Sequence, residues 1–118
     1  MTDNAIAKAV RKHQLRNDTL VQEFERRSVN LNEPRIIDFH FCAWNQRDAA
    51  VVARSLYEIG FLVKLLAPAP TESDPKLWAI EAGAKIPLVQ ATGSELTEKL
   101  VRIAINEDAT FDGWGTSV

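Results

Sequence analysis

Residues Arg35 to Trp44 read Arg-Ile-Ile-Asp-Phe-His-Phe-Cys-Ala-Trp, and this stretch decides the fold. Its β-branched and aromatic residues favour a strand over a helix. Side chains alternate along a strand, so one face carries only apolar groups, namely Ile37, Phe39, Phe41 and Ala43. The opposite face is mixed and carries Ile36, Asp38, His40, Cys42 and Trp44. Such a strand is predicted to be central in its sheet, with something lying over both faces.

Length and composition set the class of protein. A chain of 118 residues can bury the core of one domain without disulfides. Its net charge of −2 argues against a generally basic, nucleic-acid-binding surface, so we expect no direct contact with nucleic acid. The single cysteine, Cys42, fits a reducing compartment. No apolar run is long enough for a membrane span or a signal peptide, so the sequence predicts a cytoplasmic protein that does not associate with membranes.

The segment before the strand is predicted to be helical between residues 4 and 28, as two helices or one kinked helix. The polar run through Asn17 marks the break, and Thr19 to Gln22 has the form of a capping box that would start a second helix at about Leu20. Arg11 and Lys12 lie off the apolar stripe. They are candidates for a partner-binding face, with ordinary solvated surface as the alternative. We expect residues 1–34 to be an N-terminal helical extension and residues 35–118 to be the main domain.

Beyond the strand, the elements can be placed by their end signals. Asn45 is a good N-cap for a helix from about Gln46 to Ile59, and Gly60 is suited to end it. The next strand begins at Phe61, with Phe61, Val63 and Leu65 expected on one face. A third strand starts near Leu77 and ends around Gly83, or continues through Ile86 after a bulge. The run Thr92 to Glu95 resembles a capping box opening a helix to about Asn106, and a last strand spans Ala109 to Trp114.

The resulting order is β-α-β-β-α-β, which predicts an α+β fold, a ferredoxin-like sandwich with an N-terminal helical extension. In this topology the first strand lies between the third and the fourth, and two helices cover one face of the sheet. The N-terminal segment is expected to cover part of the other face through Val21 and Phe24. That other face is predicted to carry Asp38, His40, Trp44, Leu62, Leu66, Glu81, Asp112 and Trp114.

The ending Phe111-Asp-Gly-Trp-Gly-Thr116 is the most specific motif in the chain. Together with Asp38-Phe-His-Phe41 and Leu56-Tyr-Glu-Ile-Gly-Phe61, it resembles the regulator of ribonuclease E activity B (RraB) family, over about Arg35 to Val118. The resemblance implies a ferredoxin-like α/β sandwich. It also implies a non-catalytic bacterial regulator, without a cofactor, that binds ribonuclease E as its protein partner and reduces its RNA-cleaving activity.

Two groups of residues are candidates for a site. Asp38, His40 and Glu81 are expected to share one face, where an imidazole and two carboxylates can hold a divalent metal or act as a base. The alternative is an ion pair or hydrogen bond within the sheet, covered by the N-terminal helix, since no motif such as His-Glu-x-x-His is present.

Asp112 and Trp114 form the second group. Trp114 is either an exposed binding residue or a structural residue packed under the N-terminal helix, and glycines on each side permit a bulge. The partner-binding candidates are therefore Asp38, His40, Asp112, Trp114, Arg11 and Lys12. There are two alternatives to a regulator. One is a small metal-binding protein or enzyme, and the other is a domain that self-associates as a homodimer through the open face and the N-terminal helix.

Overall fold

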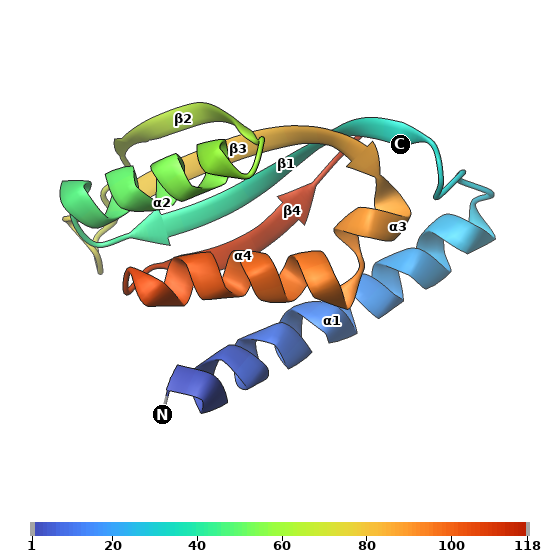
Figure 1. Cartoon of the computed structure of the whole chain (residues 1–118), viewed down its shortest axis with the longest axis horizontal. Coiled ribbons are helices and arrows are strands. Elements are labelled where there is room, and N and C mark those ends of the chain that lie inside the picture. Colours follow the sequence, from blue (N-terminus) through green and yellow to red (C-terminus); the bar gives the residue numbers. More distant parts are fainter. Residues whose placement is uncertain (1, 118) are drawn as a thin grey trace.

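The strand β1 (Pro34–Ala43) lies inside a four-stranded antiparallel sheet in the computed structural model, which describes residues 2–117. The other strands are β2 (Leu62–Pro68), β3 (Trp78–Pro87) and β4 (Thr110–Gly115), and the order across the sheet is β2-β3-β1-β4. The first strand thus lies between the third and fourth, as predicted. Figure 1 shows the arrangement.

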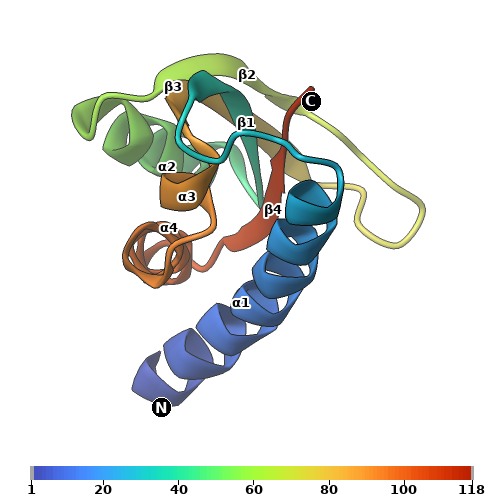
Figure 2. The ribbon, with the colours of Figure 1, turned by 90° about the vertical axis from the view of Figure 1, so that its right-hand side faces the viewer.

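Two helices, α2 (Gln46–Glu58) and α4 (Ser94–Asn106), cover one face of this sheet (Figure 1). The apolar face of β1 is buried beneath them, with Ile37 and Phe39 both 0% exposed. These side chains share the core with Leu56 of α2 and Leu100 of α4. The ferredoxin-like α+β sandwich is therefore confirmed. The expectation that both faces of β1 are covered is wrong, because the second face of the sheet is open to solvent (Figure 2).

The ends of α2 follow the sequence signals. Asn45 Oδ1 accepts a hydrogen bond from the Asp48 amide at 2.8 Å, which satisfies a free N–H in the first turn. Gly60 has a φ of +96°, and the Phe61 amide returns to the Leu56 carbonyl at 3.0 Å. This is the glycine-terminated helix end that the sequence predicted.

The predicted capping box at Thr92 is wrong. A short helix, α3 (Leu88–Ala91), precedes α4, and the Thr92 hydroxyl donates to the Leu88 carbonyl at 2.9 Å. Thr92 therefore closes α3, while Gly93 is the N-cap of α4 and offers no side chain. One turn of helix is too short to give a clear hydrophobic period, so the sequence did not separate the two elements.

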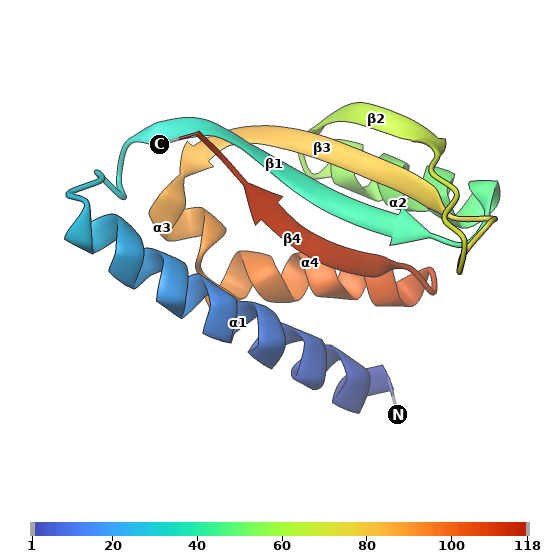
Figure 3. The ribbon, with the colours of Figure 1, turned by 180° about the vertical axis from the view of Figure 1, so that it is seen from behind.

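The N-terminal segment forms one unbroken helix, α1 (Thr2–Arg26), and the predicted break near Asn17 is wrong. The Thr19 hydroxyl donates back to the Leu15 carbonyl at 3.2 Å instead of capping a second helix. The expected cover of the open face is also wrong. α1 runs beside α4 and the β4 edge, on the helical side of the sheet, where Phe24 is buried (Figures 2 and 3). Within residues 2–117, no helix is both long and apolar enough to cross a membrane.

A bulge in β2 changes which side chains point to the open face. The register between β2 and β3 shifts between Val63 and Leu65, so Lys64 is an extra residue. Leu65 therefore lies opposite Glu81 on the open face, and Leu66 lies opposite Ile80 on the helical side. The sequence-based assignment of Leu65 and Leu66 was the reverse. β3 itself continues to Pro87 with no shift against β1, which settles its length.

A second bulge lies in β4. Phe111 pairs with Phe41 and Gly113 pairs with His40, which leaves Asp112 as the extra residue. The following residue, Trp114, pairs with Phe39 and so points to the helical side. The predicted placement of Trp114 on the open face is wrong, because simple alternation from Phe111 does not allow for the extra residue.

Candidate functional site

The open face of the sheet brings together the polar residues that the sequence selected, but in two separate pairs. His40 and Glu81 lie directly opposite each other, with His40 Nδ1 3.7 Å from Glu81 Oε1. Asp38 instead accepts from Lys64 Nζ at 2.8 Å. In the part of the chain that the structure describes, no three His, Cys, Asp or Glu side chains are grouped to hold a metal ion. The open face therefore carries two cross-strand polar pairs, of which Asp38–Lys64 is an ion pair.

The Asp38–Lys64 ion pair crosses the sheet above Gly83. Lys64 is on β2 and Asp38 is on β1, and the strand between them carries Gly83 at this level. A Cβ at Gly83 would lie 3.1 Å from Lys64 Cδ and 3.2 Å from Asp38 Oδ1. The hydrogen bond from Lys64 to Asp38 raises the pKa of the lysine. The bridge thus needs a residue without a side chain beneath it, which explains a glycine in the middle of a strand.

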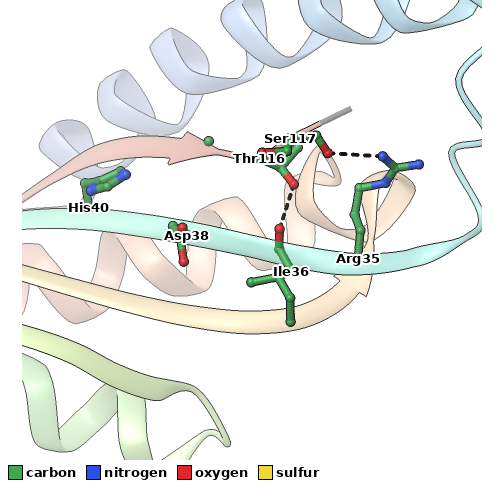
Figure 4. Close-up of a pocket in the computed structure, with 7 residues that line it drawn as sticks. Arg35, Ile36, Asp38, His40, Thr116 and Ser117 are labelled. Atoms are coloured by element: carbon green, nitrogen blue, oxygen red, sulfur yellow. Dashed lines mark hydrogen bonds between the residues drawn. The ribbon is translucent and has the colours of Figure 1, made fainter.

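A hollow of about 440 Å³ lies beside this bridge (Figure 4). The segment after β4 forms one wall, because the Thr116 hydroxyl donates to the Ile36 carbonyl at 2.6 Å. The guanidinium of Arg35 closes the end by donating to the Ser117 carbonyl at 3.3 Å. Sequence reasoning selected Asp38 and His40 here but missed Arg35, Ile36 and Thr116. The only feature of the sequence that could have indicated these three residues was the Gly-Thr pair that follows Trp114 in the closing motif.

Asp112 and Cys42 lie side by side on the same face. Asp112 is exposed at the bulge of β4, and Cys42 is partly buried on β1. Burial, followed by the charge and hydrogen bond of Asp112, raises the pKa of the Cys42 thiol to about 11. The thiol is therefore neutral at physiological pH and is not an activated nucleophile.

We expect Cys42 to react slowly with alkylating reagents. With a pKa of about 11, the thiolate is on the order of one molecule in a thousand at about pH 8. The rate at which iodoacetamide modifies Cys42 should be at least about a hundredfold lower than its rate with free cysteine. Mass spectrometry of the protein over time measures this rate. Asp112→Asn should accelerate the reaction, because it removes the adjacent negative charge. A rate equal to that of free cysteine would contradict this account of the thiol.

Trp114 is held beneath α1 rather than exposed. It is only 6% exposed, and its indole Nε1 donates to Asn17 Oδ1 at 2.9 Å. The amide of Asn17, itself 2% exposed, donates to Thr97 on α4 at 3.3 Å. The structural role that the sequence left open for Trp114 is the one observed. Asn17 thereby joins α1, α4 and the closing motif through one buried polar network.

Side chains of α1 also occupy the free edge of β4. Arg16 Nη2 donates to the Trp114 carbonyl at 3.1 Å, and His13 Nε2 lies 3.0 Å from the Phe111 carbonyl. These carbonyls would otherwise be open to another strand, so α1 protects the edge. Arg11 and Lys12 are both exposed on α1, and Lys12 lines a hollow together with His13 and Phe111.

The stability contributed by His13 should fall in acid. Its pKa lies below the usual 6.5, chiefly because burial disfavours the charged ring. Lys12 and Arg16 lower it further, while the bond to the Phe111 carbonyl and the charge of Asp112 raise it. A folded-state pKa below the unfolded value means that the unfolded chain binds the extra proton. The contribution of His13 to the free energy of unfolding is therefore complete above pH 6.5 and is lost as the pH falls below that value.

The matched variant for this prediction is His13→Gln, which removes the titrating ring. The free energy of unfolding of the wild type and of His13→Gln is measured in urea at about pH 7.5 and at about pH 5.5. The difference between the two proteins should be smaller at the lower pH. A difference that widens in acid would show that the ring is protonated in the folded protein.

The whole chain can now be compared with known proteins. The model of one family, described as "Regulator of ribonuclease activity B", matches residues 14–116. The match begins in the second half of α1, so it includes Arg16 and Asn17 as well as the closing motif that they contact. A search of curated proteins gave no match. The chain belongs to the regulator of ribonuclease activity B (RraB) family.

Proposed function

We propose that this protein is a non-catalytic regulator that binds a ribonuclease in the bacterial cytoplasm and lowers its RNA-cleaving activity. The observation that carries the proposal is the family match across residues 14–116. Ribonuclease E is the partner that the resemblance of the closing motif implies. A regulator of ribonuclease E needs a surface that binds a protein, and it does not need a bound cofactor.

The chemistry of the open face supports binding rather than catalysis. Asp38 forms an ion pair with Lys64, and the His40 ring lies 3.7 Å from Glu81, so both groups already contact a polar side chain. The only thiol of the chain is neutral at physiological pH because its pKa is raised to about 11. A general base or nucleophile needs a group that is free to exchange its proton near neutral pH, and these contacts do not favour one.

The part of the open face next to β4, at the opposite edge of the sheet from β2, is the surface that we propose for docking the ribonuclease. Asp38 and His40 line the hollow beside β4 (Figure 4). Asp112 is exposed at the bulge of the same strand. Trp114 would act indirectly, by fixing the bulge that exposes Asp112. Arg11 and Lys12 are exposed on α1, and neither residue lines this hollow.

The test is binding of the full chain to purified ribonuclease E, with capture from the native cell extract to reveal other ribonucleases. The double variant His40→Ala/Asp112→Ala should weaken binding by about tenfold or more, because two polar contacts at an interface contribute about 1–2 kcal/mol. Arg11→Ala/Lys12→Ala is the matched control and should leave binding unchanged. The proposal fails if the wild-type protein binds no ribonuclease. Loss of binding only in the α1 variant would move the docking surface to that helix.

A further inference from the structure

A cluster of exposed apolar side chains marks the corner where α2 ends and β2 begins. Tyr57 is 71% exposed and Leu62 is 68% exposed, and Ile36 and Leu65 lie nearby on the open face at 56% and 44%. Large apolar side chains gathered in this way are a feature of interaction surfaces, whereas scattered ones are ordinary. We call this set the Leu62 corner.

Two hollows flank Leu62, and their charges differ. The first, of about 420 Å³, lies between Leu62 and Ile36 and has Lys64 and Lys85 on its rim. The second, of about 440 Å³, lies between Leu62 and Tyr57 and has Glu58 on its rim. Both share Leu62 and Gly60. One surface therefore carries a basic hollow and an acidic hollow on opposite sides of a projecting leucine.

We propose that the Leu62 corner is the docking surface for a second copy of this chain, in a dimer whose twofold axis passes close to Leu62. A twofold axis places the same patch of both copies together. The basic hollow of one copy then faces the acidic hollow of the other, so Lys85 of each copy meets Glu58 of the other. The two Leu62 side chains meet at the axis, and Tyr57 of each copy covers the hollow beside Ile36 of the other.

The charges at this corner are available for such pairing. Lys64 is already bound to Asp38, which leaves Lys85 as the cation for a new partner. Glu58 contacts Arg54 at 3.0 Å, but both side chains are exposed and lie one helical turn apart. Such pairs contribute little to stability, so Glu58 can exchange its partner at small cost.

The contact that we propose is made by side chains and not by pairing of strand edges. The bulge at Lys64 and the proline that ends β2 interrupt the free edge of that strand. A patch of a few apolar side chains is at the small end of specific interfaces, which bury roughly 1,200 Å² or more in total. The dimer should therefore be weak and dependent on concentration. It does not depend on the proposed ribonuclease partner.

The test is sedimentation of the full chain from about 5 µM to about 500 µM, a range chosen for a weak dimer. The average mass of the wild-type protein should rise towards that of a dimer. Lys85→Glu and Glu58→Lys should each weaken dimerisation by about tenfold or more, because each places like charges together. The double variant Lys85→Glu/Glu58→Lys should restore it, since the pairing is re-formed with the signs exchanged. Lys76→Glu, which makes the same charge change on an exposed loop, is the matched control.

Two results would overturn the proposal. One is a wild-type protein that remains monomeric across the whole range. The other is a double variant that dimerises no better than the single variants while circular dichroism shows that it is folded. Leu62→Lys separates the proposal from ribonuclease binding, and it should prevent dimerisation and leave that binding intact. A variant that keeps its self-association but loses ribonuclease binding would assign the corner to the ribonuclease instead.

Discussion

Trp114→Ala is expected to lower the free energy of unfolding by about 3–5 kcal/mol, the usual cost of removing a large buried aromatic side chain. Trp114 packs near Phe24 of α1, with ring centroids 6.4 Å apart, and donates to the buried Asn17. Its loss would leave a cavity between α1 and β4 and a buried amide oxygen without its donor. Urea unfolding followed by circular dichroism measures the change.

Two matched variants separate the loss of the hydrogen bond from the loss of the buried aromatic ring. Trp114→Phe keeps most of the aromatic volume but removes the indole N–H, so we expect a cost of about 1–3 kcal/mol from the unpaired Asn17 oxygen. Trp44→Ala removes a tryptophan that is 42% exposed and should cost less than about 1 kcal/mol. Equal costs for Trp114→Ala and Trp44→Ala would show that Trp114 does not hold α1 to the sheet.

Gly113→Ala is expected to cost about 2–4 kcal/mol, from backbone strain together with a lost hydrogen bond. The φ of Gly113 is +115°, a conformation that residues with a side chain rarely adopt. A Cβ there would also lie 2.6 Å from Arg16 Nη1, so the guanidinium would have to leave the Trp114 carbonyl. The same urea unfolding measures the loss.

Gly115→Ala is the matched control, because a Cβ at Gly115 meets nothing within 4 Å. It should change stability by less than about 1 kcal/mol. In an Arg16→Ala background the cost of Gly113→Ala should fall, since only the backbone strain remains. If the two glycine variants were equally stable, the bulge would not be the reason for a glycine at residue 113.

The sequence predicted the parts of the fold that depend on local patterns. The alternation of Ile37, Phe39 and Phe41 located the central strand and its buried face. Asn45 and Gly60 marked the two ends of α2, because each satisfies free backbone groups within a few residues. The order of elements then limited the topology to the one observed.

The sequence-based predictions were wrong where an extra residue in a strand, or a contact with a distant part of the chain, overrides the local pattern. The bulges at Lys64 and Asp112 each add a residue, which reverses the face of every side chain that follows. A glycine at residue 113 is compatible with the bulge at Asp112, so the sequence partly indicated that bulge. Nothing in the sequence around Lys64 indicated the bulge there. Asn17 appeared to interrupt a helix because its partners, Thr97 and Trp114, are about eighty or more residues away.

The candidate site shows the same division. The sequence placed Asp38, His40 and Glu81 on one face correctly, because they follow strand alternation. It did not show that Lys64 reaches across Gly83 to Asp38, since that contact depends on the β2 bulge and on the order of the strands. The three residues are thus divided between the Asp38–Lys64 ion pair and the His40–Glu81 contact, on a surface suited to binding.

Inhibition can be measured directly as the rate at which purified ribonuclease E, from the organism that makes this protein, cleaves a defined RNA as the protein is added. We expect cleavage to slow progressively as the protein concentration rises. The double variant His40→Ala/Asp112→Ala should require about tenfold more protein for the same effect, because it binds ribonuclease E more weakly. An unchanged cleavage rate at every concentration of the folded wild-type protein would contradict the account.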